Sequence, residues 1–161
     1  METNKVKAIL IGAGQRGAQV YGAFARRNPN DIVFVAVAEP DEARRKEFCR
    51  DHGICPDNAV EDWHELLERP KMADCAFVCT QDNQHIAPAM AALQAGYHVV
   101  MEKPMSRNAD ELRELKALAE EKGKLVTVCH VLRYTPFFSK VKELLDAGKI
   151  GQLQSVQQIE N

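Results

Sequence analysis

Short apolar runs alternate with longer segments of helical periodicity along most of the chain. The apolar runs predict five strands, at 6–12, 32–39, 75–80, 98–101 and 124–130. The second run is continuously β-branched and apolar, which is typical of a strand buried on both faces. The segments between them predict helices, over 14–27, 41–53, 62–69, 85–95, 108–123 and 135–148. Strands separated by helices of this length imply right-handed crossovers, so the pattern predicts a doubly wound α/β fold with a parallel sheet.

Local signals indicate how individual helices begin, end and pack. In the first helix, Val20 and Phe24 are expected to lie on one face. Asn108 with Glu111 three residues later predicts a capping box at the start of the fifth helix, and Gly123 predicts its end.

The final residues depart from the repeating pattern. The segment 151–161 is rich in glutamine and extended in character, but no partner strand is evident in the sequence. We therefore expect a dinucleotide-binding domain over 1–130, a connecting helical segment over 131–150, and the first strand of a second, α+β substrate domain over 151–161. We therefore expect the chain to be a truncated part of a longer protein.

Composition and charge narrow the class of protein. The chain has 161 residues, a net charge of −2, 45% hydrophobic and 27% charged residues, which is ordinary for a soluble domain. This charge indicates no binding of nucleic acid or acidic membranes, and no apolar run approaches the length of a bilayer span. Five scattered cysteines fit reduced thiols in the cytoplasm, and their spacing predicts no metal site.

A glycine motif follows the first strand and opens the first helix. In "GAGQRG", Gly12 permits a tight turn, Gly14 permits close backbone approach to a pyrophosphate, and Gly17 permits close helix–strand packing. Gln15 and Arg16 fall at the positive helix N-terminus, where phosphates bind. The context predicts a dinucleotide-binding loop.

An acidic residue, Glu39, ends the second strand. At that place a carboxylate accepts hydrogen bonds from the adenosine ribose hydroxyls and repels a 2′-phosphate, which favours NAD over NADP. Arg44 and Arg45 follow closely and offer two interpretations. They bind a 2′-phosphate, or they belong to a solvated helix face with neighbouring acids.

Two further loops follow strands that are expected to end at the same edge of the sheet. In Thr80–His85, Thr80 and Asn83 cap a helix or touch the cofactor, and His85 contributes to the site or is a surface residue. In "MEKP", Glu102 and Lys103 should point to opposite sides of extended chain, and Pro104 fixes the backbone after the lysine. Lys103 is placed to exchange a proton with a substrate hydroxyl; a surface ion pair is the alternative.

Four stretches of the sequence resemble the Gfo/Idh/MocA family of oxidoreductases (glucose-fructose oxidoreductase, inositol dehydrogenase and rhizopine catabolism). The resemblance covers nearly the whole chain, in "AILIGAGQRG", "VAVAEPDEARR", "CTQDNQHIAPAMAALQAGYHVVMEKPMSRNADEL" and "VLRYTPFFSKVKELLDAGKIGQLQSV". It implies that Lys103 is the catalytic lysine and that the Lys103–Pro104 peptide is cis. It also implies that His85 and Glu102 lie near the cofactor and Arg133 and Tyr134 near the active site. Gln81 departs from the family's usual proline.

The residues together predict the nucleotide-binding part of an oxidoreductase that moves a hydride between nicotinamide and a sugar, polyol or related hydroxy compound. The expected cofactor residues are Gly12, Gly14, Gln15, Arg16, Gly17, Glu39, Thr80, Asn83, His85, Glu102, Lys103, Pro104 and Arg133. The resemblance further implies a second domain with a catalytic histidine and a homo-oligomeric full-length protein, so this chain alone is expected to be inactive. Two alternatives are a non-catalytic dinucleotide sensor and an S-adenosylmethionine methyltransferase.

Overall fold

The computed structural model describes residues 5–159 and divides the chain into two compact units, one up to Cys129 and one from His130 onward. In the described part of the first unit, six strands form one parallel sheet in the order β3-β2-β1-β4-β5-β6. Their bounds are β1 (Val6–Ile11), β2 (Ile32–Ala38), β3 (Ala59–Val60), β4 (Cys75–Val78), β5 (His98–Met101) and β6 (Val126–Val128). This confirms the predicted doubly wound fold. The sequence pattern missed β3, which has only two residues.

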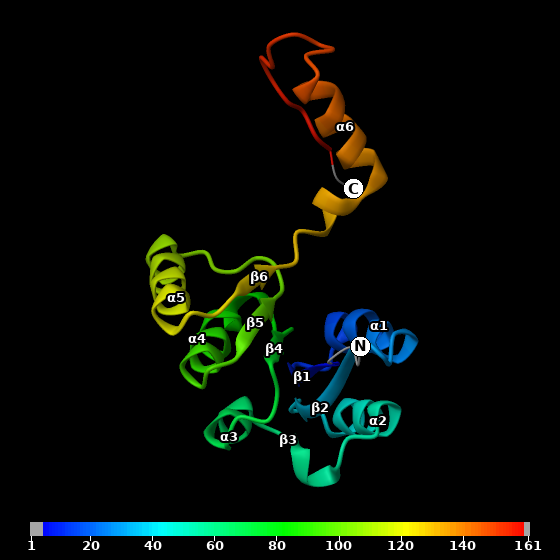
Figure 1. Ribbon diagram of the computed structural model, residues 1–161, viewed down its shortest axis with the longest axis vertical. Coiled ribbons are helices and arrows are strands. Elements are labelled where there is room, and N and C mark those ends of the chain that lie inside the picture. The colour runs from blue at the N-terminus through cyan, green and yellow to red at the C-terminus, as the bar shows by residue number, and fades with distance from the viewer. Residues whose placement is uncertain (1–4, 160–161) are drawn as a thin grey trace. The chain divides into compact units, whose positions relative to one another are not determined.

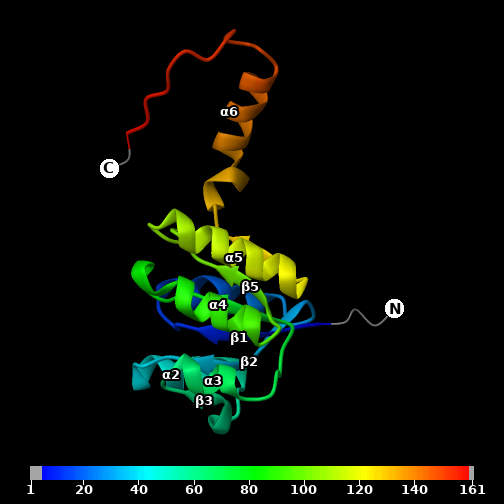
Figure 2. The same cartoon turned by 90° about the vertical axis from the view of Figure 1, so that its left-hand side faces the viewer.

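Helices cover both faces of the sheet. They are η1 (Gln15–Gly22, wound as a π-helix) continuing into α1 (Ala23–Arg27), α2 (Glu42–His52), α3 (Trp63–Glu68), α4 (Ile86–Gln94) and α5 (Ala109–Lys122), with short 3₁₀ turns η2 (Pro56–Asn58) and η3 (Asp82–Gln84). Figure 1 shows α1 and α2 on one face and α3, α4 and α5 on the other. Figure 2 turns the face with α3, α4 and α5 toward the viewer.

Each face of the sheet has its own apolar core. Beneath α3, α4 and α5, buried side chains such as Leu66, Leu93 and Leu115 pack on the sheet. On the opposite face, Phe34 contacts Phe48 edge-on with ring centroids 5.4 Å apart. Because both faces are covered, all four residues of the central strand β4 are buried.

Small residues, and not the predicted apolar pair, pack the first helix. Val20 and Phe24, which were expected on one face of this helix, are 38% and 51% exposed. A Cβ atom on Gly22 would lie 2.8 Å from the Phe48 ring. The helix therefore approaches α2 too closely for larger side chains, and its buried positions are glycine and alanine.

Asn108 caps α5 as predicted, but the capping box with Glu111 is absent. The Asn108 side chain accepts from the backbone N–H of Asp110 at 2.9 Å, and Gly123 ends the helix in the left-handed conformation. Glu111 does not close a capping box, because Ser106 lies between: its hydroxyl donates to Glu111 and accepts from the N–H of Asn108.

The second unit contains η4 (Val131–Tyr134) and α6 (Pro136–Asp146). The apolar side chains of Phe137, Val141 and Leu144 on α6 are exposed. Residues 151–159 have no regular secondary structure, and 160–161 lie outside the described residues, so the strand expected over 151–161 stays a prediction. None of the helices in the part of the chain that the structure describes is long and apolar enough to cross a membrane.

Candidate functional site

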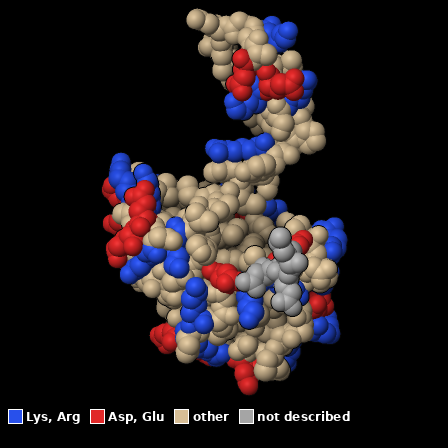
Figure 3. Space-filling view, in the orientation of Figure 1, with Lys and Arg blue, Asp and Glu red and all other residues tan. Residues whose placement is uncertain are grey.

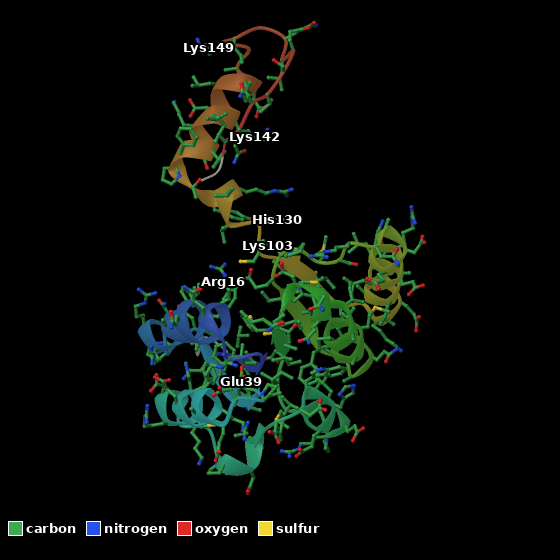
Figure 4. All side chains as sticks on the ribbon, turned by 180° about the vertical axis from the view of Figure 1, so that it is seen from behind. Arg16, Glu39, Lys103, His130, Lys142 and Lys149 are labelled. Carbon is green, nitrogen blue, oxygen red and sulfur yellow. The ribbon has the colours of Figure 1, made fainter. Side chains whose placement is uncertain are left out.

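The carboxyl ends of the parallel strands form the edge where the candidate residues gather. The order of the strands reverses between β1 and β4, and in such sheets ligands bind at this switch point. Figure 4 shows Arg16, Glu39 and Lys103 along this edge, between the two helical layers. A cleft of about 730 Å³ lies here. Its lining includes Gly12, Gly14, Glu39, Arg44, Thr80, Gln81 and Asn83.

The glycine loop has the geometry that the motif predicts. Gly12 has a φ of +94°, and a Cβ there would lie 2.6 Å from the carbonyl oxygen of Cys79. A Cβ on Gly17 would lie 2.1 Å from the carbonyl oxygen of Gly12. A Cβ on Gly14, by contrast, would meet no described atom within 4 Å, and Gly14 lines the cleft. The loop thus leaves open space at the N-terminus of η1, which fits a pyrophosphate.

Glu39 is a buried carboxylate, only 3% exposed, that joins the end of β2 to the glycine loop. One oxygen accepts from the backbone N–H of Ala13 at 2.7 Å. The other accepts from the N–H of Asp41 at 3.0 Å and from Arg44 at 2.9 Å. A carboxylate offers about four acceptor positions. Within the described residues one acceptor position of Glu39, which lines the cleft, therefore remains unused.

The two arginines of α2 do not form a purely solvated face. Arg44 pairs with the Glu39 carboxylate and lines the cleft. Arg45 donates to the carbonyl oxygens of Glu39 and Pro40. Arg44 is therefore a cation beside the place where the adenosine ribose is expected, and Arg45 supports the backbone there.

The loop after β4 contributes backbone and side-chain contacts. The Thr80 hydroxyl donates to the carbonyl oxygen of Gln84 at 3.0 Å, which stabilises the turn, and Asn83 lines the cleft. His85 is 1% exposed, so it is not a surface residue. Its Nδ1 lies 2.7 Å from the carbonyl oxygen of Pro104 and its Nε2 lies 3.1 Å from that of Thr80.

Glu102 connects the end of β5 to the glycine-loop helix. Its Oε1 accepts from Nε of Arg16 at 2.9 Å and from the Tyr21 hydroxyl at 2.6 Å. Burial alone would raise the pKa of Glu102, but the hydrogen bonds from Tyr21 and Arg16 outweigh it and lower the pKa below its usual range. Burial and hydrogen bonding raise the pKa of Tyr21, so its hydroxyl stays a donor. Glu102 is therefore an ionised structural acceptor.

Lys103 follows and is exposed, whereas Glu102 is buried, which is compatible with the expectation that the two side chains point to opposite sides. The Lys103–Pro104 peptide is cis, as the resemblance implied. Lys103 does not line the cleft described above; it lies along the same edge, beside the pair formed by Arg16 and Glu102. Arg133 and Tyr134 belong to η4 of the second unit, and Tyr134 is exposed.

Sequence reasoning missed two aromatic residues near this edge. Trp63 and His64 line the cleft with their rings stacked at a centroid distance of 3.5 Å, and Asp62 holds the His64 ring at 2.7 Å. Recognition of β3 would have placed them at a strand end. Tyr21 was also missed, and no sequence signal marks it, because its partner Glu102 is 81 positions away.

Charges elsewhere on the first unit are mixed. Figure 3 shows Lys and Arg side chains interleaved with Asp and Glu on the face that it displays, for example over α5. Surface ion pairs such as Lys116–Glu120 on α5 contribute to this pattern. The face shown therefore has no single-sign patch of the kind that binds nucleic acid.

Comparison with known proteins adds to this geometry. The family model described as "Oxidoreductase family, NAD-binding Rossmann fold" (GFO_IDH_MocA) matches residues 6–130. The scyllo-inositol 2-dehydrogenase (NADP⁺) of Bacillus subtilis is 30% identical over 158 residues, which are 97% of this chain and 42% of that protein.

Two solved structures are similar in fold and sequence. The 3-ketoreductase KijD10 of Actinomadura kijaniata in complex with NADP has a TM-score of 0.79 and 28% identity, covering 92% of this chain and 46% of that one. An inositol dehydrogenase homologue of Azotobacter vinelandii with NADH and myo-inositol has a TM-score of 0.76 and 26% identity, covering 92% and 41%. The chain thus spans less than half the length of these proteins.

Proposed function

The chain belongs to the Gfo/Idh/MocA oxidoreductase family, with an NAD-binding Rossmann fold, and from this premise we propose that it forms the cofactor-binding part of a dehydrogenase. The reaction moves a hydride between the nicotinamide and a carbon of a sugar, polyol or related hydroxy compound. The observation that carries this proposal is the convergence of four loops, after β1, β2, β4 and β5, on one edge of the sheet.

Each loop has its own task in the proposal. The N-terminus of η1, with Gly14, Gln15 and Arg16, faces the pyrophosphate. Glu39 accepts from the adenosine ribose. The bound dinucleotide supplies the hydride chemistry, and the protein supplies binding and orientation. Lys103, at the far end of the same edge, holds the substrate hydroxyl and shares its proton.

The remaining cofactor residues of the proposal lie between these two ends. Thr80 and Asn83 flank the middle of the dinucleotide, and the family resemblance adds Arg133 to the cofactor residues. His85, Glu102 and Pro104 act close to the cofactor through the loops that carry them. The contacts of His85 with Pro104 and of Glu102 with Arg16 connect these loops to one another and support the assignment of His85, Glu102 and Pro104.

We further propose NAD as the preferred cofactor. The Glu39 carboxylate is buried at the cleft with one free acceptor position, which suits a ribose hydroxyl and opposes a 2′-phosphate. Relatives bind either NADP or NADH. Arg44 neutralises part of the charge of Glu39, so a weaker affinity for NADP is expected in addition.

Substrate recognition is proposed for a region that this chain does not span. The inositol substrates of the relatives support a polyol-like substrate, and each relative is more than twice as long as the part that matches. By the resemblance, that region brings a histidine that shares the proton of Lys103. In this proposal residues 1–130 bind the cofactor, 131–150 connect, and 151–161 begin a second domain. The full-length protein is a cytoplasmic homo-oligomer, and the present chain turns over little.

The test compares Lys103→Ala with the exposed control Lys116→Ala in the full-length protein. Binding of NADH is followed by calorimetry, and oxidation of a panel of inositols and sugars by the absorbance of NADH. Loss of a proton-transferring group lowers turnover by about 100-fold or more, while affinity for NADH stays within about threefold. A sensor would bind NADH and show no turnover in either variant. Binding of S-adenosylmethionine in place of NADH would contradict the proposal.

A further inference from the structure

The residues on either side of Lys103 are each fixed by a different cofactor loop. We propose that these contacts position the lysine: Arg16 and Tyr21 act through Glu102, and His85 acts through Pro104. This inference rests on the proposed role of Lys103 and adds three positioning residues that do not themselves take part in the chemistry.

The first contact fixes the residue before the lysine. Glu102 is 4% exposed, and one of its oxygens accepts from both Arg16 and Tyr21, which are five positions apart on η1. Its other oxygen lies 3.3 Å from the backbone N–H of Lys103. Hydrogen bonds to a charged acceptor are stronger than neutral ones. Through Glu102 the glycine-loop helix therefore holds the backbone where Lys103 begins.

The second contact fixes the residue after the lysine. His85 is fully enclosed and its two ring nitrogens face two carbonyl oxygens, of Pro104 and Thr80. Both carbonyl oxygens are acceptors, so a ring nitrogen that carries a proton donates to the oxygen that it faces. The shorter distance, 2.7 Å against 3.1 Å, favours donation from Nδ1 to Pro104. The loop after β4 thereby holds the backbone where Lys103 ends.

Neither contact is needed to close the sheet. The ladder of β5 with β4 and β6 already fixes residues 98–101 and also the backbone N–H of Glu102, which donates to the carbonyl oxygen of Val78 at 3.0 Å. The Glu102 side chain and Pro104 lie beyond this ladder. The lysine side chain is long and exposed, so it has many rotamers and its backbone position sets its reach. Because the two anchors come from the loops proposed to hold the dinucleotide, they place Lys103 relative to the cofactor.

The test measures hydrogen–deuterium exchange of residues 102–106 in variants of this chain. Tyr21→Phe removes one of the two hydrogen bonds that hold Glu102, and His85→Ala removes the contact with Pro104. Loss of a hydrogen bond of this kind should accelerate local opening, and exchange with it, by about tenfold. Tyr97→Phe is the matched control, because the Tyr97 hydroxyl also takes part in one hydrogen bond, accepting from the N–H of Met72, and lies away from this edge.

The conservative variants of His85 separate the anchor from general packing. An asparagine amide nitrogen takes the place of Nδ1, whereas a glutamine amide nitrogen takes the place of Nε2. His85→Asn should restore slow exchange at 102–106, and His85→Gln should not. Slow exchange in both or in neither would overturn the role of Pro104 as the held group.

Two results would overturn the inference as a whole. One is unchanged exchange at 102–106 in Tyr21→Phe and in the His85 variants. The other is equal acceleration across β1, β4 and residues 102–106, which reports only a loss of global stability. NADH protection of residues 12–17, measured in the same samples, separates the two proposals. If NADH protects the loop in wild type, the proposed cofactor site stands whatever the anchors do.

Discussion

Replacing Glu39 by serine should shift the choice between NADH and NADPH. The carboxylate is buried at the cleft and carries the negative charge that opposes a 2′-phosphate. It also holds Arg44 at 2.9 Å. Serine removes the charge, keeps a small polar group and releases the arginine toward the cleft. NADH should therefore bind more weakly and NADPH more tightly than to wild type.

The size of the shift follows from two terms. A ribose hydroxyl that loses its charged acceptor costs about 1.5–3 kcal/mol, or about 10- to 100-fold in affinity for NADH. A full carboxylate–phosphate repulsion at about 4 Å amounts to about 4 kcal/mol at an effective dielectric constant of about 20. Arg44 is half exposed and already neutralises part of the charge of Glu39. We therefore expect about 1–2 kcal/mol of this repulsion to act against the 2′-phosphate of NADPH. The ratio of the two affinities should change by about 100-fold or more.

Calorimetric titration of wild type and Glu39→Ser with both cofactors measures this ratio. Glu39→Gln is the matched control, because it keeps the size and one acceptor oxygen and should fall between the two. Arg44→Ala in the Glu39→Ser background should remove the gain for NADPH. Thermal unfolding checks the fold, since Ala13 and Asp41 lose their acceptor. A folded Glu39→Ser with the ratio of wild type would refute the assignment of Glu39 to the ribose.

Three shorter predictions test the rest of the edge. Gly17→Ala should unfold at a clearly lower temperature than wild type, because its Cβ would lie 2.1 Å from the carbonyl oxygen of Gly12. Gly14→Ala, whose Cβ would meet open space, should keep its stability and lose affinity for NADH by about tenfold. Equal unfolding temperatures and equal affinities in the two variants would contradict the loop geometry. Trp63 is the chain's one tryptophan and lines the cleft, so NADH should quench its fluorescence, and an unchanged emission at saturation argues against binding there. Because the pKa of Glu102 is lowered in the folded state, its ionised carboxylate stabilises the fold fully above the pKa of an unfolded glutamate, about 4.3, and this stabilisation is lost as the pH falls through the folded pKa. In urea unfolding, the free energy of unfolding of Glu102→Gln should therefore decrease less on acidification than that of wild type.

The positions of strands and of the polar loops at their ends could be predicted from local pattern. A buried parallel strand leaves a continuous apolar run, and a turn with positive φ leaves a glycine such as Gly12. These signals are local in sequence, so one chain suffices to find them. From them the doubly wound order and the common edge follow.

Contacts between distant segments could not be predicted in the same way. Arg16 and Glu102 are 86 positions apart, and nothing in either local stretch identifies the other as its partner. Val20 and Phe24 fit a helical apolar face, but the distance between the first helix and α2 leaves room only for small residues such as Gly22. The two-residue strand β3 is too short to leave a period of its own.

The two acids that follow β2 and β5 both form hydrogen bonds with the glycine loop or with the helix that it opens. The loop therefore connects the two acids. Glu39 accepts from the N–H of Ala13, just before the helix, and Glu102 accepts from Arg16 and Tyr21 within it. A dinucleotide that binds at the N-terminus of this helix thus contacts the segment that holds both the ribose acceptor and the backbone of Lys103. On the proposed function, we expect ordering of this helix on binding to reach both ends of the site through charged hydrogen bonds and so to couple cofactor binding to the placement of Lys103.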